Sequence, residues 1–140
     1  MQMQNTAPRT RRDGAAAVAL PLVWVFLSLN YILCDLLSNM EAGTLRGLLE
    51  GVAGGFPVSQ GFLLFAGVTL ELPILMTLLS AVLPGRANTI VNVCAAGLLI
   101  VYQAGSFFVG SGTSLHYAFF SAIEILGNAL VVFLALRRKR

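Results

Sequence analysis

Four apolar stretches, each long enough to cross a lipid bilayer, constrain this chain more than any other feature of its sequence. A helix needs about 20 apolar residues to cross the hydrocarbon core. The stretches cover about residues 15–38, 60–83, 87–109 and 114–136. Each should be a helix, because backbone N–H and C=O groups in lipid must pair within the protein. The sequence therefore predicts an all-α integral membrane protein, an antiparallel four-helix bundle that forms one domain over residues 15–136.

The composition supports this assignment and excludes several other classes of protein. Of the 140 residues, 57% are hydrophobic and 11% are charged, whereas soluble globular domains average about 45–50% and about 25%. Such a chain is neither a disordered segment nor an ordinary soluble enzyme. The net charge of +3 does not indicate a nucleic-acid partner, since the basic residues gather at the chain ends and turns. The expected partner is the lipid bilayer.

The Lys and Arg residues predict the orientation of the bundle. Eight of the nine lie in a polar arm (residues 1–14), at Arg86 between the second and third spans, and in a basic tail (residues 137–140). With four spans these segments share one side, and the other side holds only Arg46. By the positive-inside rule the first side is cytoplasmic. We therefore expect a multi-pass protein of the cell (inner) membrane with both termini in the cytoplasm.

The long connection over residues 39–59 is expected on the external side. Its residues 44–52, TLRGLLEGV, favour a short helix in the membrane interface. A simple linker is the alternative, and the pattern leaves the role of this loop open.

Polar residues inside the spans carry most of the information about function. Side chains spaced three and four residues apart lie on one face of a helix. Such stripes consist of Trp24, Ser28, Tyr31 and Asp35 in the first span, Asn88, Asn92, Gln103 and Ser106 in the third, and Tyr117, Ser121, Glu124 and Asn128 in the fourth. In the second span Glu71 lies one turn after Gly67. We expect all these faces to turn inward into one bundle.

Three carboxyl groups, those of Asp35, Glu71 and Glu124, lie within the spans. An ionisable group at the bilayer centre costs at least about 2.5–3.5 kcal/mol on insertion scales, so each must be neutralised, paired or used. Glu71 lies about 16 Å and Glu124 about 15 Å from the external ends of their helices, at the helical rise per residue. The sequence therefore predicts a central pair of glutamates, with Asp35 and His116 nearer the external surface.

This pair of carboxyls suggests acid–base chemistry. Two carboxyls close together in low dielectric cannot both ionise cheaply, so one should hold a proton at neutral pH. A protonated and an ionised carboxyl can then serve as acid and base. Isomerisation, cyclisation or epoxide opening of a lipophilic small molecule would suit Glu71 and Glu124 as catalytic residues, with Asp35 as a third.

Other polar and aromatic side chains would bind or orient such a molecule. The candidates are Trp24, Asn30, Tyr31, Asn92, Gln103, His116, Tyr117 and Asn128. His116 beside Asp35 could relay protons from the external face, and an ordinary interfacial anchor is the alternative. No cofactor and no metal are expected, because no Cys and His pattern matches a metal site.

Two other functions fit the same residues. One is a small proton-coupled transporter, expected to act as a homodimer, in which the glutamates bind the coupled proton. The other is a non-catalytic accessory subunit or sensor, in which the carboxyls only fasten the helices through hydrogen bonds.

Three segments, WVFLSLNYILCDLLS, LELPILMTLLSAVLPGRANTIVNV and YAFFSAIEI, together resemble an uncharacterised bacterial family of small four-helix integral membrane proteins, a domain of unknown function. The resemblance covers roughly residues 20–136. Its recurring elements would be Asn30, Tyr31 and Asp35, the Glu71-Leu72-Pro73 step, Arg86-Ala87-Asn88 with Asn92, and Tyr117 with Glu124. The resemblance implies the fold and the membrane location, and it implies no reaction.

Overall fold

The computed structural model describes residues 11–108 and 114–137, which are almost entirely helical. The elements in chain order are α1 (Arg11–Asn39), α2 (Ala42–Leu49), β1 (Val52–Ala53), β2 (Phe56–Pro57), α3 (Gln60–Val82), α4 (Gly85–Ser106) and α5 (Leu115–Arg137). Four of the helices, α1, α3, α4 and α5, are long and apolar enough to cross a membrane. The predicted all-α fold with four membrane spans is confirmed, and the chain is a multi-pass membrane protein.

The helix ends differ from the predicted spans by a few residues. Helix α1 begins at Arg11, so residues 11–14 of the predicted polar arm are helical. Helix α5 includes Arg137, the first residue of the predicted tail. Between α3 and α4 the chain turns tightly at Gly85, whose φ of 48° lies in the left-handed region that favours glycine.

The connection between α1 and α3 has more structure than the sequence predicts. Helix α2 covers most of the expected interfacial helix, and a short antiparallel hairpin follows it, pairing Val52 with Pro57 and Ala53 with Phe56. The hairpin turn is made by Gly54 and Gly55, both with positive φ. Strands of two residues are too short to show the alternation that identifies a strand in sequence.

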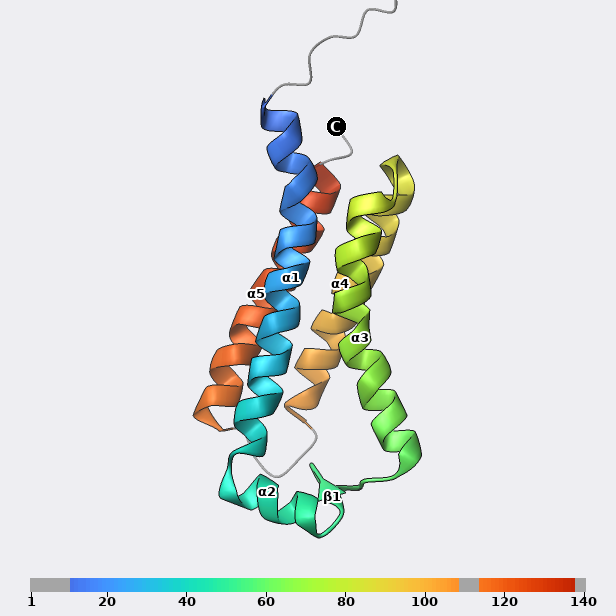
Figure 1. The fold of residues 1–140 in the computed structure, drawn as a ribbon. Coiled ribbons are helices and arrows are strands. Elements are labelled where there is room, and N and C mark those ends of the chain that lie inside the picture. The colour runs from blue at the N-terminus through green and yellow to red at the C-terminus, as the bar shows by residue number, and fades with distance from the viewer. Residues whose placement is uncertain (1–10, 109–113, 138–140) are drawn as a thin grey trace, which may run out of the picture.

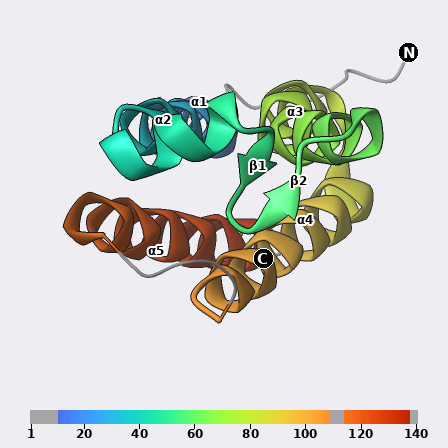
Figure 2. The same ribbon diagram turned by 90° about the horizontal axis from the view of Figure 1, so that it is seen from below.

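The four long helices run alternately down and up the bundle (Figure 1). Seen along the bundle, α1 and α3 lie side by side above α5 and α4 (Figure 2). Helix α1 packs against α3 and α5, and α4 packs against α5, whereas the contact between α3 and α4 is much smaller. The start of α1, the α3–α4 turn and the end of α5 lie at one end of the bundle, and α2 with the hairpin lies at the other (Figure 1).

The half of the bundle near the α3–α4 turn is closely filled. Its core contains the buried side chains of Leu20, Trp24, Leu27, Met76 and Val131. At this depth α1 and α5 approach closely at Gly127, where an added Cβ would lie 2.6 Å from Leu27 Cδ2.

A chain of buried amide hydrogen bonds joins three helices in the same half. The Trp24 indole N–H donates to Asn92 Oδ1 at 2.7 Å. The Asn92 amide donates to Asn88 Oδ1 at 2.9 Å, and the Asn88 amide donates to the carbonyl oxygen of Ser80 at 2.7 Å. These bonds satisfy polar groups that lipid cannot satisfy, and they connect α1, α4 and the end of α3.

Candidate functional site

A cavity of about 360 Å³ lies in the other half of the bundle, toward α2 and the hairpin. All four long helices line it, and Leu48 of α2 and Ala53 of β1 line it from the end. Its polar lining consists of Tyr31, Asp35, Ser38, Asn39, Thr69, Tyr102, Gln103, Ser106, Tyr117 and Glu124. Small-molecule sites have volumes of about 300–1,000 Å³, so this cavity is large enough for a small ligand.

Glu124, near the middle of α5, has the most unusual environment in the cavity wall. Its side chain is 1% exposed, and its Oε1 atom has no hydrogen-bond partner among the described residues. Burying a carboxyl without a partner is costly, and nearly all buried polar groups in native proteins have one.

Asn128 and Tyr31 join α5 to α1 beside this carboxyl. The Asn128 amide donates to Tyr31 Oη at 2.9 Å and to the backbone oxygen of Glu124 at 2.8 Å. The Asn128 Oδ1 atom has no partner among the described residues. The two side chains therefore fix the wall around Glu124, and Tyr31 itself lines the cavity.

Gln103 and Tyr117 form a second polar group across α4 and α5. The Gln103 amide donates to Ser121 Oγ and, at 3.4 Å, to Tyr117 Oη. The Tyr117 hydroxyl in turn donates to Ser106 Oγ. Because each side chain is held by a neighbour, Gln103 and Tyr117 have fixed positions in the cavity wall.

Asp35 provides a second carboxyl in the lining, from α1. None of the described residues that line the cavity is Lys, Arg or His. The described part of the lining therefore combines two carboxyls with hydroxyl and amide groups and has no basic side chain. Such a site favours positive charge or hydrogen-bond donors.

The inward orientation predicted for the polar stripes of α4 and α5 is confirmed, but the predicted pair of Glu71 with Glu124 is wrong. Glu71 is exposed and does not line the cavity. The inward face of α3 carries Pro73, Met76 and Ser80, and Glu71 lies about 200° around the helix from Pro73. The position of Glu71 along its helix indicates its depth in the membrane, but it does not fix the side of the helix on which the carboxyl lies. Asp35 takes its place as the second carboxyl.

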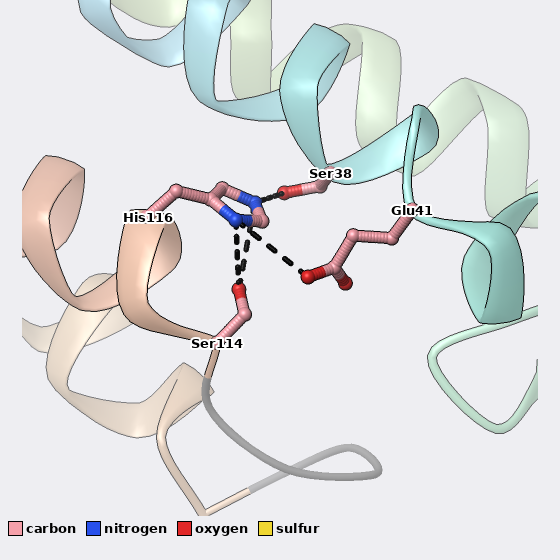
Figure 3. Close-up of polar contacts among 4 residues, drawn as sticks. All are labelled: Ser38, Glu41, Ser114 and His116. Atoms are coloured by element: carbon pink, nitrogen blue, oxygen red, sulfur yellow. Dashed lines mark hydrogen bonds and ion pairs between the residues drawn. The ribbon is translucent and has the colours of Figure 1, made fainter.

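His116 lies near the start of α5, at the α2 end of the bundle, and does not pair with Asp35. Figure 3 shows its ring between Ser38, Ser114 and Glu41. The ring is 3.2 Å from Ser38 Oγ and 3.1 Å from Ser114 Oγ, and its Nδ1 atom is 3.6 Å from Glu41 Oε1. The predicted proton relay between His116 and Asp35 is therefore not formed. His116 instead contacts the turn between α1 and α2, because this turn lies level with the start of α5.

Four other predicted binding residues, Trp24, Asn30, Asn92 and Asn128, lie outside the cavity lining, and Asn128 bonds to Tyr31 beside it. Trp24 and Asn92 bond to each other in the filled half of the bundle. The Asn30 amide donates to the backbone oxygen of Phe26 in its own helix, at 3.1 Å. Their polar atoms serve helix packing.

Sequence reasoning missed some residues of the cavity wall. Tyr102 lines the cavity but lies one residue away from the polar stripe that contains Gln103. Its aromatic ring with a polar tip, next to that stripe, was the available signal. Leu48 and Ala53 also line the cavity, and nothing in the sequence indicates that the external connection folds back over the bundle.

The described ranges, 11–108 and 114–137, contain no group of three His, Cys, Asp or Glu residues that could hold a metal ion. Residues 11–140 match the model of a family described as a family of unknown function (DUF6326). Neither the curated proteins nor the solved structures contain a match to the chain. The family match agrees with the resemblance seen in the sequence, and its description carries no activity.

Proposed function

The chain belongs to DUF6326, a family of unknown function, and we propose from its own cavity that it binds a lipophilic small molecule within the membrane. One observation carries this proposal. Glu124 belongs to the lining of a cavity in the bundle, and its buried carboxyl has an oxygen without a partner among the described residues.

The lining supports a ligand that is mostly apolar. Beside its polar groups the cavity is lined by Phe62, Ala66, Leu70 and Leu99. Apolar walls with a few fixed polar groups are typical of small-molecule sites, where the polar groups orient the ligand. Glu124, Tyr31 and Gln103 are the side chains suited to that role.

The pair of carboxyls also supports chemistry on the bound molecule. Asp35 and Glu124 share one low-dielectric cavity, so one can hold a proton that the other lacks. Acting as acid and base, they would suit a cofactor-free isomerisation, cyclisation or epoxide opening. Tyr117 and Gln103, fixed by their neighbours, would position the substrate.

The packing favours binding over transport. Transport requires access to the site from both sides of the membrane. The half of the bundle near the α3–α4 turn is filled by Leu20, Trp24 and Leu27, which are fully buried, and is crossed by the amide chain through Asn92.

We also propose that both termini face the cytoplasm, which places the cavity in the external half of the membrane. Arg86 and Arg137 lie at the end of the bundle opposite α2, and basic residues mark the cytoplasmic side. A fluorescent-protein fusion at the C-terminus should fluoresce, and an alkaline phosphatase fusion within residues 39–59 should be active. The reverse pattern would contradict this orientation.

Native mass spectrometry of protein released gently from membranes tests the binding proposal. Wild type should retain a stoichiometric small molecule other than bulk phospholipid, and Glu124→Gln should lose it. Glu71→Gln is the matched control, because it removes a carboxyl from a membrane-spanning helix outside the cavity. An empty wild-type protein, or equal retention in Glu124→Gln, would refute the proposed site.

A further inference from the structure

We propose that the ligand is a lipophilic amine, a molecule with a protonated amino group on an apolar chain that reaches the cavity from the lipid between α3 and α4. This inference rests on the proposed function, and it names the class of molecule that the site selects.

The charge of the lining selects a cation. Asp35 and Glu124 line the cavity, and the described lining holds no Lys, Arg or His to neutralise them. An ionised acid in this cavity would add a further negative charge in low dielectric, where like charges repel strongly. A protonated amine would instead be attracted to the carboxyl that is ionised, and it would donate hydrogen bonds to both carboxyls while accepting none from either.

The hydrogen-bonding groups agree with this choice. An ammonium group carries three donors and no acceptor. Acceptors come from the carboxyl-bearing residues Asp35 and Glu124 of the lining, and the enclosed Glu124 Oε1 atom has no partner among the described residues. Charge-assisted hydrogen bonds are roughly twice as strong as neutral ones, so an amine satisfies Glu124 better than an alcohol does.

The arrangement of the helices provides a lateral route. Helix α3 packs along α1 but makes much smaller contact with α4, and the two helices separate from their shared turn toward the α2 end (Figure 1). Residues of both helices, Ala66 and Thr69 of α3 and Tyr102 of α4, line the cavity. Tyr102 is also 44% exposed, so it lies at both the cavity and the outer surface.

The end of the cavity is covered from the aqueous side. Leu48 of α2 and Ala53 of β1 belong to its lining; α2 lies over the end of α1, and the hairpin lies near the centre of the end of the bundle (Figure 2). A molecule dissolved in the bilayer therefore has a shorter route than one in water. Its amino group would lie at Asp35 and Glu124, and its chain would extend between α3 and α4 into lipid.

A matched series of probes tests the inference. Dodecylamine, dodecanol and dodecanoate share one chain and differ in headgroup. Each is titrated by calorimetry at pH 7 into the protein in phosphatidylcholine nanodiscs, with empty nanodiscs as the blank. We expect dodecylamine to bind about tenfold or more tightly than dodecanol, given the strength of hydrogen bonds to charged groups. Dodecanoate should not bind above the blank.

Variants test whether the preference for the amine arises at the carboxyls of the cavity. Glu124→Gln and Asp35→Asn should each reduce the preference for the amine about tenfold. Because Asp35 is exposed, Asp35→Asn should fold. It therefore tests the role of negative charge in amine binding even if Glu124→Gln fails to fold. Glu71→Gln is the control for negative charge in the membrane and should leave the preference unchanged. Hexadecylamine should also bind, since a lateral opening admits a longer chain.

The outcomes separate this inference from the proposed function. If the amine and the alcohol bind equally and the cavity-filling variant Ala66→Phe abolishes the binding of both, the site does not select a cation. The proposed binding site would still stand. A preference for the amine that persists in Asp35→Asn, or falls equally in Glu71→Gln, would indicate surface adsorption and overturn the inference. No binding of any probe to wild type would overturn both the inference and the proposed function.

Discussion

Gly127 provides a sharp test of how closely α1 and α5 pack. A methyl group at this position would lie 2.6 Å from Leu27 Cδ2 and 3.3 Å from Leu27 Cγ. Carbon atoms in favourable contact are about 3.5–4.0 Å apart. Leu27 is fully buried, so it has little room to move away. We predict that Gly127→Ala destabilises the bundle.

The magnitude follows from two opposing effects. Inserting a methyl into a well-packed core costs about 1–3 kcal/mol, and replacing glycine by alanine in a helix gains about 1 kcal/mol. Gly97→Ala is the matched control, because Gly97 is also helical and nothing lies within 4 Å of its added Cβ. The difference in unfolding free energy between Gly97→Ala and Gly127→Ala should therefore be about 1–3 kcal/mol, the cost of the overpacking alone.

A double-mutant cycle with Leu27→Ala tests the cause. The single variant Leu27→Ala should cost about 2–5 kcal/mol, because it leaves a cavity in the core. In that background the Gly127 methyl fills space, so Gly127→Ala should become neutral or stabilising. Reversible unfolding in mixed micelles measures all four proteins. The reasoning is refuted if Gly127→Ala is as stable as Gly97→Ala, or if the two effects simply add.

Two further predictions concern polar contacts. Asn92→Leu should lower the unfolding free energy by about 1–2 kcal/mol, since it leaves the Trp24 indole N–H without an acceptor. Asn30→Leu loses only a bond to its own helix and should lower the unfolding free energy less. Equal losses for the two variants, measured by unfolding in micelles, would contradict a role of Asn92 in holding the helices together. His116→Ala should change the global unfolding free energy by less than about 1 kcal/mol but speed amide hydrogen exchange in residues 40–59, because it releases the contact with Glu41. Glu41→Gln should have a weaker effect of the same kind, and unchanged exchange in both variants would show that this contact does not hold the external segment.

The fold could be predicted because membrane crossing depends on length and composition. A stretch of apolar residues fixes both the helix and its place in lipid. The orientation of α4 and α5 could also be predicted, since Asn92, Gln103, Ser121 and Glu124 form stripes at helical spacing and all are buried. Regular spacing over several turns gives a direction as well as a depth.

The second carboxyl of the cavity could not be predicted because α3 has no such stripe. Glu71 is an isolated polar residue there, so its depth was known but its direction was not, and it points away from the buried face that carries Pro73 and Met76. The partner of His116 was missed for another reason. Glu41 lies beyond the end of α1, and its position depends on the turn into α2, which leaves no periodic signal.

Photolabelling shows directly whether the cavity at Glu124 holds a lipophilic molecule. Diazirine derivatives of dodecylamine and dodecanol would be crosslinked to the protein in nanodiscs, and the labelled residues identified by peptide sequencing. We expect labels on Phe62, Ala66 and Tyr102, which line the cavity, and we expect these labels to disappear with excess unlabelled probe. Labels spread over the outward residues Leu64 and Val68, unaffected by competitor, would contradict this expectation.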